Sequence, residues 1–489
     1  MISFDNSYAR ELPGFYSPFA PQAFPSPALL RWNADLAEEL GLSLAGVSAE
    51  QLARWFSGSE LPDGAQPIAQ AYAGHQFGNF VPQLGDGRAL LLGEVVDRHG
   101  RRRDIAFKGS GATPFSRGGD GKAAVGPVLR EYVVGEAMHA LGIPTTRALA
   151  AVATGEPVRR ERTLPGAVLT RVAASHIRVG TFQYFAVRGD LEKLRRLADY
   201  VIARHYPEIG NDADRYLSLL RAVAGRQASL IAQWMHVGFI HGVMNTDNMA
   251  ISGETIDYGP CAFMEAYDSA TVFSSIDRGG RYAYGRQPAI AQWNLARFAE
   301  TLLPLIDEAE QDRAVERATE VLQQFAAVFA EAWLAGMRRK LGLTTAADED
   351  RALVDDWLAL IQKHGADYTL AWRRLADTVD QDAPSLHEML ADPGELSAWL
   401  ARWRRRLATE SQAPADVAAA MRKVNPLYIP RNQRVEEALA AATDDGDLRP
   451  FERLLEAVTR PFEERPGYEI FAEPAAVEFA SCFRTFCGT

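Results

Sequence analysis

Apolar residues along this chain change their spacing, and the change separates a strand-rich part from a helix-rich part. Between about residues 83 and 149 they gather in short blocks, such as ALLLGEVV, which are divided by polar turns such as DRHGR. Blocks of this length predict strands rather than helices. We expect strands at Ala89–Val96, Arg103–Lys108, Leu149–Thr154 and Ala167–Val172.

Helical spacing prevails elsewhere. One helix is predicted within the strand-rich part, at Pro127–Leu141, where the proline suits the first turn and Gly142 the end. Beyond about residue 182 helices dominate, interrupted by one short β segment at Met249–Ile256 with a turn at residues 252–254. The other expected helices are Leu191–Tyr206, Ala213–Gly238, Pro288–Leu305, Gln311–Leu341, Ala352–Lys363, Glu395–Thr409 and Arg434–Ala441.

The first 66 residues differ from both parts. Five prolines from Pro13 to Pro27 exclude long regular elements there, and helices are expected around Ala28–Leu40 and Ala49–Phe56. The whole pattern predicts an α+β fold. Its four parts are an N-terminal arm (1–66), a strand-rich lobe (67–180), a helical lobe (181–344) and a C-terminal helical extension (345–489).

Composition narrows the class of partner and the compartment. The net charge of −11 argues against nucleic acid, because binding its phosphates needs a basic surface. No apolar run reaches the roughly 18 residues of a membrane span, and the first residues lack a signal-peptide pattern. Three cysteines in 489 residues favour a reducing compartment over a disulfide framework. We therefore expect a cytoplasmic protein that contacts neither nucleic acid nor membrane.

Candidate chemistry begins with Lys108, which ends an apolar strand in the segment FKGSG. A lysine there normally faces solvent, but Glu131 follows 23 residues later in a predicted helix. A strand lysine held by a helix glutamate and aimed at nucleotide phosphates is central to the protein-kinase site. Glu131 has the kinase-like spacing, so we expect Glu136 to lie at the surface or to play a secondary part.

Three further segments could contact a nucleotide. In LGDGRALLLGE, two glycines and an arginine precede a strand, where backbone N–H groups can approach a phosphate, although a plain hairpin turn looks the same. The loop TPFSRGGDGKA could bend over a nucleotide or be a mobile surface loop. Two arginines in TRVAASHIRVGTF could grip phosphate oxygens or belong to a solvated connector. The residues concerned are Gly85, Gly87, Arg88, Asp120, Gly121, Arg171 and Arg178.

The strongest local signal is IHGVMNTDN, followed by MAISGETIDYG. Protein kinases carry a His-Arg-Asp or His-Gly-Asp triplet, an asparagine five residues after that aspartate, and then Asp-Phe-Gly. That asparagine and the second aspartate bind Mg²⁺. Asn248 and Asp257 match these ligands, with Tyr258 in place of phenylalanine. Val243 occupies the position of the catalytic aspartate, but a carboxylate, Asp247, stands beside Asn248.

These segments resemble the selenoprotein O family, the YdiU group of bacterial proteins. The resemblance rests on YAGHQFGNFVPQLGDGRALLLGE, FKGSGATPFSRGGDGKA, GEAMHALGIPTTRAL and HGVMNTDNMAISGETIDYGPCAFMEAYD, which lie within roughly residues 70–270. It implies a bilobal, protein kinase-like fold in which ATP binds in reversed orientation. AMP would then be transferred to Ser, Thr or Tyr hydroxyls of protein substrates, including the enzyme itself, and UTP could serve as a second donor.

The same resemblance implies a role for each candidate residue. Asn248 and Asp257 would hold Mg²⁺ or Mn²⁺, Asp247 would be the catalytic base, and Glu131 would support Lys108. Four cations suit a pocket that must hold the departing pyrophosphate. The nucleotide contacts would fall on Gly85, Gly87, Arg88, Lys108, Asp120, Gly121, Arg171, Arg178 and Asp257.

Two other functions stay open at this point. One is a conventional phosphotransferase, against which Val243 argues, because the base would have to be relocated. The other is a nucleotide-sensing pseudokinase scaffold, against which the presence of both Asn248 and Asp257 argues.

Cysteines near the site suggest redox control. Members of the family end in a cysteine or selenocysteine close to the carboxyl terminus, here Cys487, and Cys261 lies just after Asp257-Tyr258-Gly259. We expect a reversible Cys261–Cys487 disulfide that lowers activity. Cys482 is the competing partner, and a spectator role for Cys487 on a frayed tail is the alternative.

Overall fold

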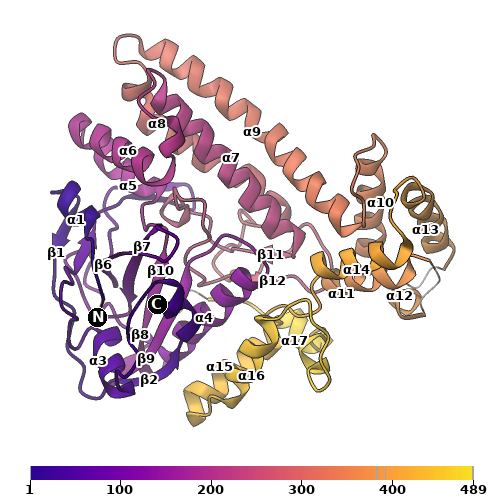
Figure 1. The fold of residues 1–489 in the computed structure, drawn as a ribbon, viewed down its shortest axis with the longest axis horizontal. Coiled ribbons are helices and arrows are strands. Elements are labelled where there is room, and N and C mark those ends of the chain that lie inside the picture. Colours follow the sequence, from indigo (N-terminus) through magenta and orange to yellow (C-terminus); the bar gives the residue numbers. More distant parts are fainter. Residues whose placement is uncertain (1, 381–383, 391–392, 487–489) are drawn as a thin grey trace.

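The computed structural model describes residues 2–380, 384–390 and 393–486. Figure 1 shows a sheet formed by the first part of the chain, long helices beside it, and further groups of helices formed by the last part. The mixed α and β class that the sequence predicts is confirmed. No helix in the described part of the chain is long and apolar enough to cross a membrane.

Eight strands form one antiparallel sheet within the described residues. Neighbouring residues of its strands point to opposite faces, and both faces are buried. Leu90 and Phe107 pack on one side with α2 and α3, whereas Leu91 and Ala106 pack on the other with α4. The strand order is β1 (Tyr16–Pro18), β3 (Ile68–Gln70), β6 (Ala89–Val96), β7 (Arg102–Lys108), β10 (Thr163–Ala173), β9 (Arg147–Arg159) and β2 (Ala28–Trp32), with β8 (Ala123–Ala124) also paired to β10.

Burial on both faces explains why apolar blocks such as ALLLGEVV run nearly without interruption. Two smaller sheets lie apart from the main one: β4 (Gly74–Gln76) with β5 (Asn79–Val81), and β11 (Phe239–Ile240) with β12 (Ala262–Phe263).

The helices fall into three groups. Those near the sheet are α1 (Ser7–Glu11), α2 (Ala34–Glu39), α3 (Ala49–Ser57) and α4 (Val125–Ala140). A central group consists of α5 (Val179–Ala186), α6 (Leu191–His205), α7 (Arg215–His236), α8 (Gln287–Ile306) and α9 (Gln311–Lys340). The last part of the chain forms α10 (Asp350–Lys363), α11 (Tyr368–Leu375), α12 (Pro384–Met389), α13 (Pro393–Leu407), α14 (Pro414–Val424), α15 (Asn432–Ala440), α16 (Arg449–Val458) and α17 (Val477–Cys482).

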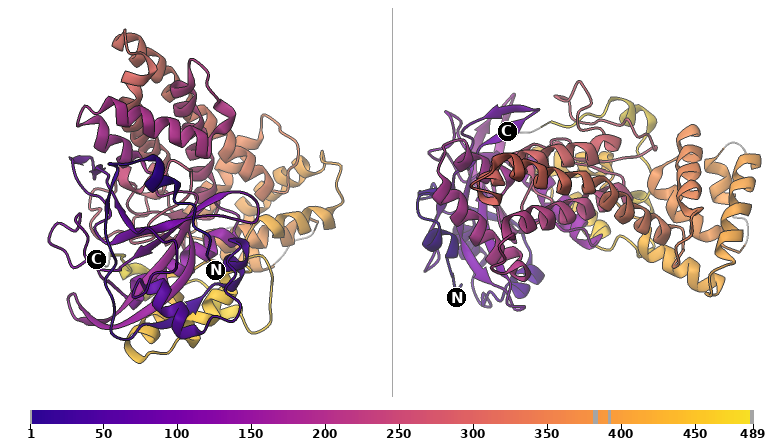
Figure 2. Two further views of the ribbon diagram at one scale, coloured as in Figure 1. Left: turned by 60° about the vertical axis from the view of Figure 1, so that its left-hand side comes forward. Right: turned by 90° about the horizontal axis from the view of Figure 1, so that it is seen from above.

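The last group divides in space. Figures 1 and 2 show α10–α14 at the far end of α9, away from the sheet, whereas α15 and α16 return to lie against α4. The Tyr132 ring of α4 meets Phe451 of α16 edge-on, with 5.9 Å between the ring centroids. Arg130 of α4 forms an ion pair with Glu436 of α15. The C-terminal helices therefore brace the helix that carries Glu131.

Two predicted elements are wrong. Residues 28–32 form β2 rather than the start of a helix, because they pair with β9 at the end of the sheet, and α2 begins only at Ala34. Residues 249–256 do not pair with each other as a hairpin. Ala250 bridges to Arg178 and Thr255 to Thr145, so the segment ties the connector after β10 to the loop after α4.

Candidate functional site

A cavity of about 530 Å³ collects side chains from the sheet, the loop after β7 and the segment 243–260. Its lining includes every residue that the sequence predicts as a nucleotide, metal or catalytic residue. These are Gly85, Gly87, Arg88, Lys108, Asp120, Gly121, Arg171, Arg178, Asp247, Asn248 and Asp257.

A cluster of three cations and two carboxylates lies at this cavity, and all of its members except Glu131 line the cavity. Lys108 Nζ lies 2.5 Å from Glu131 Oε2 and 2.6 Å from Asp257 Oδ1. The Arg171 guanidinium lies 3.0 Å from Glu131 Oε1 and 2.7 Å from Asp257 Oδ1. Arg178 is the third cation, 3.5 Å from Asp257 Oδ2. The cluster has one positive charge in excess, so it can accept an anion.

Both carboxylates of the cluster are ionised. Burial by itself would raise the pKa of Asp257, but Lys108, Arg171 and Arg178 hold it well below its usual range. At Glu131, burial again acts to raise the pKa and the charges of Lys108 and Arg171 act to lower it. The charges prevail, and the pKa of Glu131 is lowered. Asp257 also adopts a left-handed backbone conformation with φ of 64°. A non-glycine residue in this region costs energy and is often found at functional sites.

The two arginines are fixed by buried neighbours. Arg171 Nε donates to His176 Nε2 at 3.2 Å, and His176 Nδ1 lies 2.9 Å from Asp104 Oδ2. Arg178 donates to the backbone oxygen of Asp247 at 2.9 Å, and its guanidinium lies 4.4 Å from the centre of the Tyr72 ring. Both guanidinium groups are therefore held in place, and the alternative of a solvated connector is wrong because both residues are buried.

Asp247 is a carboxylate on the cavity wall that lies outside this cluster. Its Oδ2 accepts from Gln76 Nε2 at 3.3 Å, and its Oδ1 is buried without a hydrogen-bond partner among the described residues. Burial raises the pKa of Asp247 to about 6, against the opposing effect of Arg178. An unpartnered buried oxygen is costly unless a ligand satisfies it. Asp247 is thus suited to accept a proton or a hydrogen bond from a bound molecule.

Asn248 lies beside Asp247, and its orientation is set by the loop. Its side-chain Nδ2 donates to the backbone oxygen of Val243 at 3.0 Å, which leaves the side-chain oxygen for a ligand. Val243 itself is buried. The position of the usual kinase base therefore holds an apolar side chain, which lines the cavity.

Glycines allow two loops to approach the cavity closely. Gly85 has φ of 68°, and a side chain there would overlap the Phe115 ring; Gly121 has φ of 64° and would overlap the backbone of Gly111. These positions favour glycine because of both backbone conformation and space. Asp120 is exposed and forms an ion pair with Arg160 at 2.8 Å, so its carboxylate is already partnered.

Three residues at the cavity escaped the sequence-based prediction. Asp86 lies between the two predicted glycines, is buried, and accepts from the backbone N–H of Gln70 at 2.9 Å. Tyr72 and Gln76 line the same cavity. All three lie in YAGHQFGNFVPQLGDGR, so the length of that motif was the only signal available for them.

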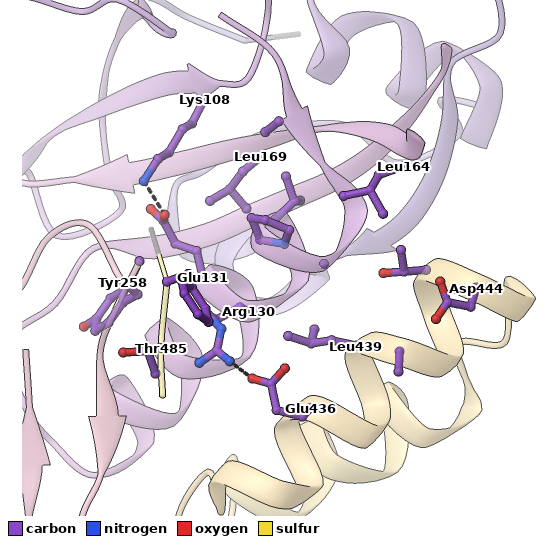
Figure 3. Close-up of a pocket in the computed structure, with 18 of the residues that line it drawn as sticks. Lys108, Arg130, Glu131, Leu164, Leu169, Tyr258, Glu436, Leu439, Asp444 and Thr485 are labelled. Atoms are coloured by element: carbon purple, nitrogen blue, oxygen red, sulfur yellow. Dashed lines mark hydrogen bonds and ion pairs between the residues drawn. The ribbon is translucent and has the colours of Figure 1, made fainter. Parts of the chain in front are cut away.

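A second cavity of about 340 Å³ lies next to the Lys108–Glu131 ion pair (Figure 3). It shares Arg88, Lys108 and Gly259 with the first cavity. Figure 3 shows Leu164 and Leu169 on one side of it and Leu439 and Glu436 of α15 on the other. The C-terminal part of the chain therefore contributes directly to the surroundings of the ion pair.

Glu136 does not lie at the surface, so that alternative is wrong, and a secondary part for Glu136 stays a prediction. It is buried and receives two hydrogen bonds from the Arg147 guanidinium, at 2.8 and 2.7 Å. It faces β9 and the arm, because the backbone N–H of Ala148 and the side-chain amide of Asn33 also donate to its carboxylate, at 3.1 and 3.0 Å. Glu136 thus fixes the end of α4 that lies away from the charge cluster.

The structure describes only one of the two cysteines of the expected disulfide. Cys261 is buried as a free thiol, and burial raises its pKa to about 12, so this thiol is poorly reactive in the conformation described. Cys487 lies outside the described residues, and its pairing stays a prediction. The chain does reach this region, because the Thr485 hydroxyl donates to the backbone oxygen of Pro260 at 2.7 Å.

The donor set suits a hard cation bound together with phosphates. In the described part of the chain, no group of three or more His, Cys, Asp or Glu side chains is placed to hold a metal by itself. Mg²⁺ is commonly held by one or two protein oxygens while phosphates and water supply the rest. Asn248 and Asp257 offer such a pair, next to cations that would hold the phosphates.

Comparison with known proteins decides the family. The family model described as "Protein adenylyltransferase SelO" matches residues 1–459. The chain belongs to the SelO family. Its SelO-family relatives include the "Protein nucleotidyltransferase YdiU" of Chromobacterium violaceum, which is 63% identical over 98% of this chain and 100% of the relative. Proteins with the same name from Cereibacter sphaeroides and Rhizobium meliloti are 63% and 60% identical, each over 99% of both chains. The resemblance inferred from the motifs is confirmed.

Proposed function

We propose that this chain transfers AMP from ATP to Ser, Thr or Tyr hydroxyls of proteins, itself included. Membership of the SelO family and relatives named protein nucleotidyltransferases support this class of reaction. The observation that carries the proposal is that one cavity contains both a cationic cluster and a separate buried carboxylate with a free oxygen. The cluster can hold a leaving pyrophosphate, and the carboxylate can take a proton from an acceptor.

The proposed framework is a bilobal, protein kinase-like fold with residues 67–180 and 181–344 as its lobes. The contact of a strand lysine, Lys108, with a helix glutamate, Glu131, supports it, as does the presence of Asn248 and Asp257 in the lining of one cavity. The arm, through β2, and the C-terminal helices α15 and α16 pack onto the first lobe.

ATP is proposed to bind with its terminal phosphates among Lys108, Arg171 and Arg178 and its α-phosphate near Asp247. Arg171 and Arg178 are both almost fully buried, at 2% and 3% exposure, so a phosphate between them would be shielded from water. Such preorganised charges act most strongly in a site that excludes water. Arg88, the turn at Gly85 and Gly87, and the loop at Asp120 and Gly121 would contact the rest of the nucleotide.

The reaction forms one bond and breaks one. The acceptor hydroxyl oxygen bonds to the α-phosphorus. The bond between that phosphorus and the oxygen that bridges the α- and β-phosphates breaks, and pyrophosphate leaves. Asp247 takes the hydroxyl proton, while Lys108, Arg171 and Arg178 stabilise the charge on pyrophosphate. Mg²⁺ or Mn²⁺, held by Asn248 and Asp257, would supply further neutralisation of the phosphate charge.

A comparison of two labels tests the proposal. With Mg²⁺, we expect α-labelled ATP to label the protein itself or an added carrier protein, and γ-labelled ATP to transfer nothing. Transfer of the γ label would instead establish a conventional kinase, and binding without transfer of either label would establish a nucleotide-sensing scaffold. A parallel arm with α-labelled UTP measures whether UMP is transferred as well.

A further inference from the structure

The hairpin formed by β4 and β5 is not explained by nucleotide binding. It is a two-stranded sheet separate from the main one, with Gln76 paired opposite Asn79. Its two-residue turn, Phe77-Gly78, has positive φ at both positions, 51° and 86°, as expected for a tight primed turn. An isolated two-stranded hairpin is marginally stable in water. Contacts with the rest of the molecule must therefore hold it in place.

Those contacts go to three consecutive residues of the loop that contains Asp247. The backbone N–H of Phe77 donates to Asn245 Oδ1 at 3.0 Å, and that of His75 donates to Thr246 Oγ1 at 2.7 Å. Gln76 Nε2 donates to Asp247 Oδ2 at 3.3 Å. The hairpin thus donates a hydrogen bond to each of these three loop residues, and the Gln76 side chain reaches the carboxylate.

A second layer of contacts fixes this arrangement from behind. Gln183 of α5 accepts from the Thr246 hydroxyl at 2.6 Å, and its amide nitrogen lies 2.8 Å from His75 Nδ1. Gly74 has no side chain, and a Cβ there would press against Asp247 Oδ1. The hairpin therefore approaches one oxygen of Asp247 closely and forms a hydrogen bond with the other.

The result is a carboxylate with two different oxygens. Oδ2 is engaged by Gln76, whereas Oδ1 is buried and has no partner among the described residues. Gln76, Phe77 and Ile276 line the same cavity as Asp247, and Ile276 is 56% exposed. Oδ1 lies against Gly74 of the hairpin, so the hairpin contacts both oxygens of the carboxylate and sets how Asp247 sits in the cavity wall.

We propose that Gln76 is a positioning residue that fixes the orientation of the Asp247 carboxylate in the cavity wall, where the acceptor hydroxyl would approach it. This inference rests on the proposed function, in which Asp247 is the base. The hairpin Gly74–Val81 is then the element that sets the geometry of proton transfer, whereas the cationic cluster sets the geometry of the phosphates. Loss of the Gln76 hydrogen bond leaves Asp247 free to rotate and lowers the rate without changing ATP binding.

The test measures self-modification with α-labelled ATP and Mg²⁺, using the full chain. Gln76→Met keeps the side-chain length but removes the donor. We expect its rate at saturating ATP to fall by about tenfold, while the ATP concentration for half-maximal rate stays within about twofold. Asn79→Ala is the matched control, because Asn79 lies directly across the hairpin, is exposed and lines neither cavity. It should keep the wild-type rate.

A double-mutant cycle separates this role from a general effect on structure. In an Asp247→Ala background, Gln76→Met should cost less than about twofold, because the group that it positions is gone. A full tenfold loss in that background, or an equal loss in Asn79→Ala, would overturn the inference. If Asp247→Ala is slow but Gln76→Met matches wild type, the inference alone fails. If Asp247→Ala keeps the wild-type rate, the assignment of Asp247 as the base fails, and the inference on Gln76 fails as well.

Discussion

Replacement of Asp257 by alanine is expected to reduce transfer to background and to remove the effect of Mg²⁺ on ATP binding. Asp257 is the only carboxylate that contacts all three cations Lys108, Arg171 and Arg178 in the described part of the chain. In the proposed function it is also the anionic ligand of the metal. Mg²⁺ binds weakly without a carboxylate or equivalent oxygen, so the metal-dependent part of the affinity should disappear.

Calorimetric titration of ATP with and without Mg²⁺ measures this effect. The wild-type protein should bind ATP more tightly with Mg²⁺, whereas Asp257→Ala should bind equally in both conditions. Asp257→Asn keeps an oxygen ligand and the shape of the side chain, and it should show an intermediate Mg²⁺ effect. An alanine variant that keeps the full Mg²⁺ effect would show that the metal is held elsewhere.

Replacement of Asp247 by alanine should separate chemistry from binding. General-base help contributes about 10²–10⁴-fold to a rate, and the variant should lose a factor in this range. ATP affinity should stay within a few fold. The Asp247 carboxylate is not part of the cationic cluster, and Arg178 contacts only the backbone oxygen of Asp247. Rates from single-turnover labelling and affinities from titration give the two quantities independently.

A third variant, Lys108→Ala, can be compared with the two aspartate variants in both ATP affinity and rate. Lys108→Ala removes one of several cations and should fall between the aspartate variants in both affinity and rate. Equal losses of ATP affinity in Asp247→Ala and Asp257→Ala would show that Asp247 belongs to the binding site rather than to the chemistry. That outcome would leave the family assignment unchanged.

Short motifs predicted the cationic site well because its residues follow regular elements. Lys108 ends a strand and Glu131 faces inward from a helix, so spacing alone predicted their contact, which is confirmed at 2.5 Å. Asn248 and Asp257 come from a pattern that kinases share, and both line the cavity. The roles of these residues in catalysis stay predictions.

Features set by distant contacts could not be predicted in the same way. Residues 28–32 have helical spacing, yet pairing with β9, more than 100 residues later, makes them a strand. Glu136 looks like a surface residue until Arg147 and Asn33 are seen beside it. Gln76 has no local signal, because its partner Asp247 is 171 residues away.

The bracing of α4 by α15 and α16 links activity to the order of protein synthesis. Arg130 and its partner Glu436 are separated by 306 residues. At ribosomal rates of about 5–20 residues per second, Glu436 is made roughly 15–60 s after α4. In the later part of that interval a growing chain has its cations and its Asp247 loop but no support behind Glu131. We expect such a chain to be a poor enzyme, which would spare neighbouring proteins at the ribosome from modification until α15 and α16 have been made.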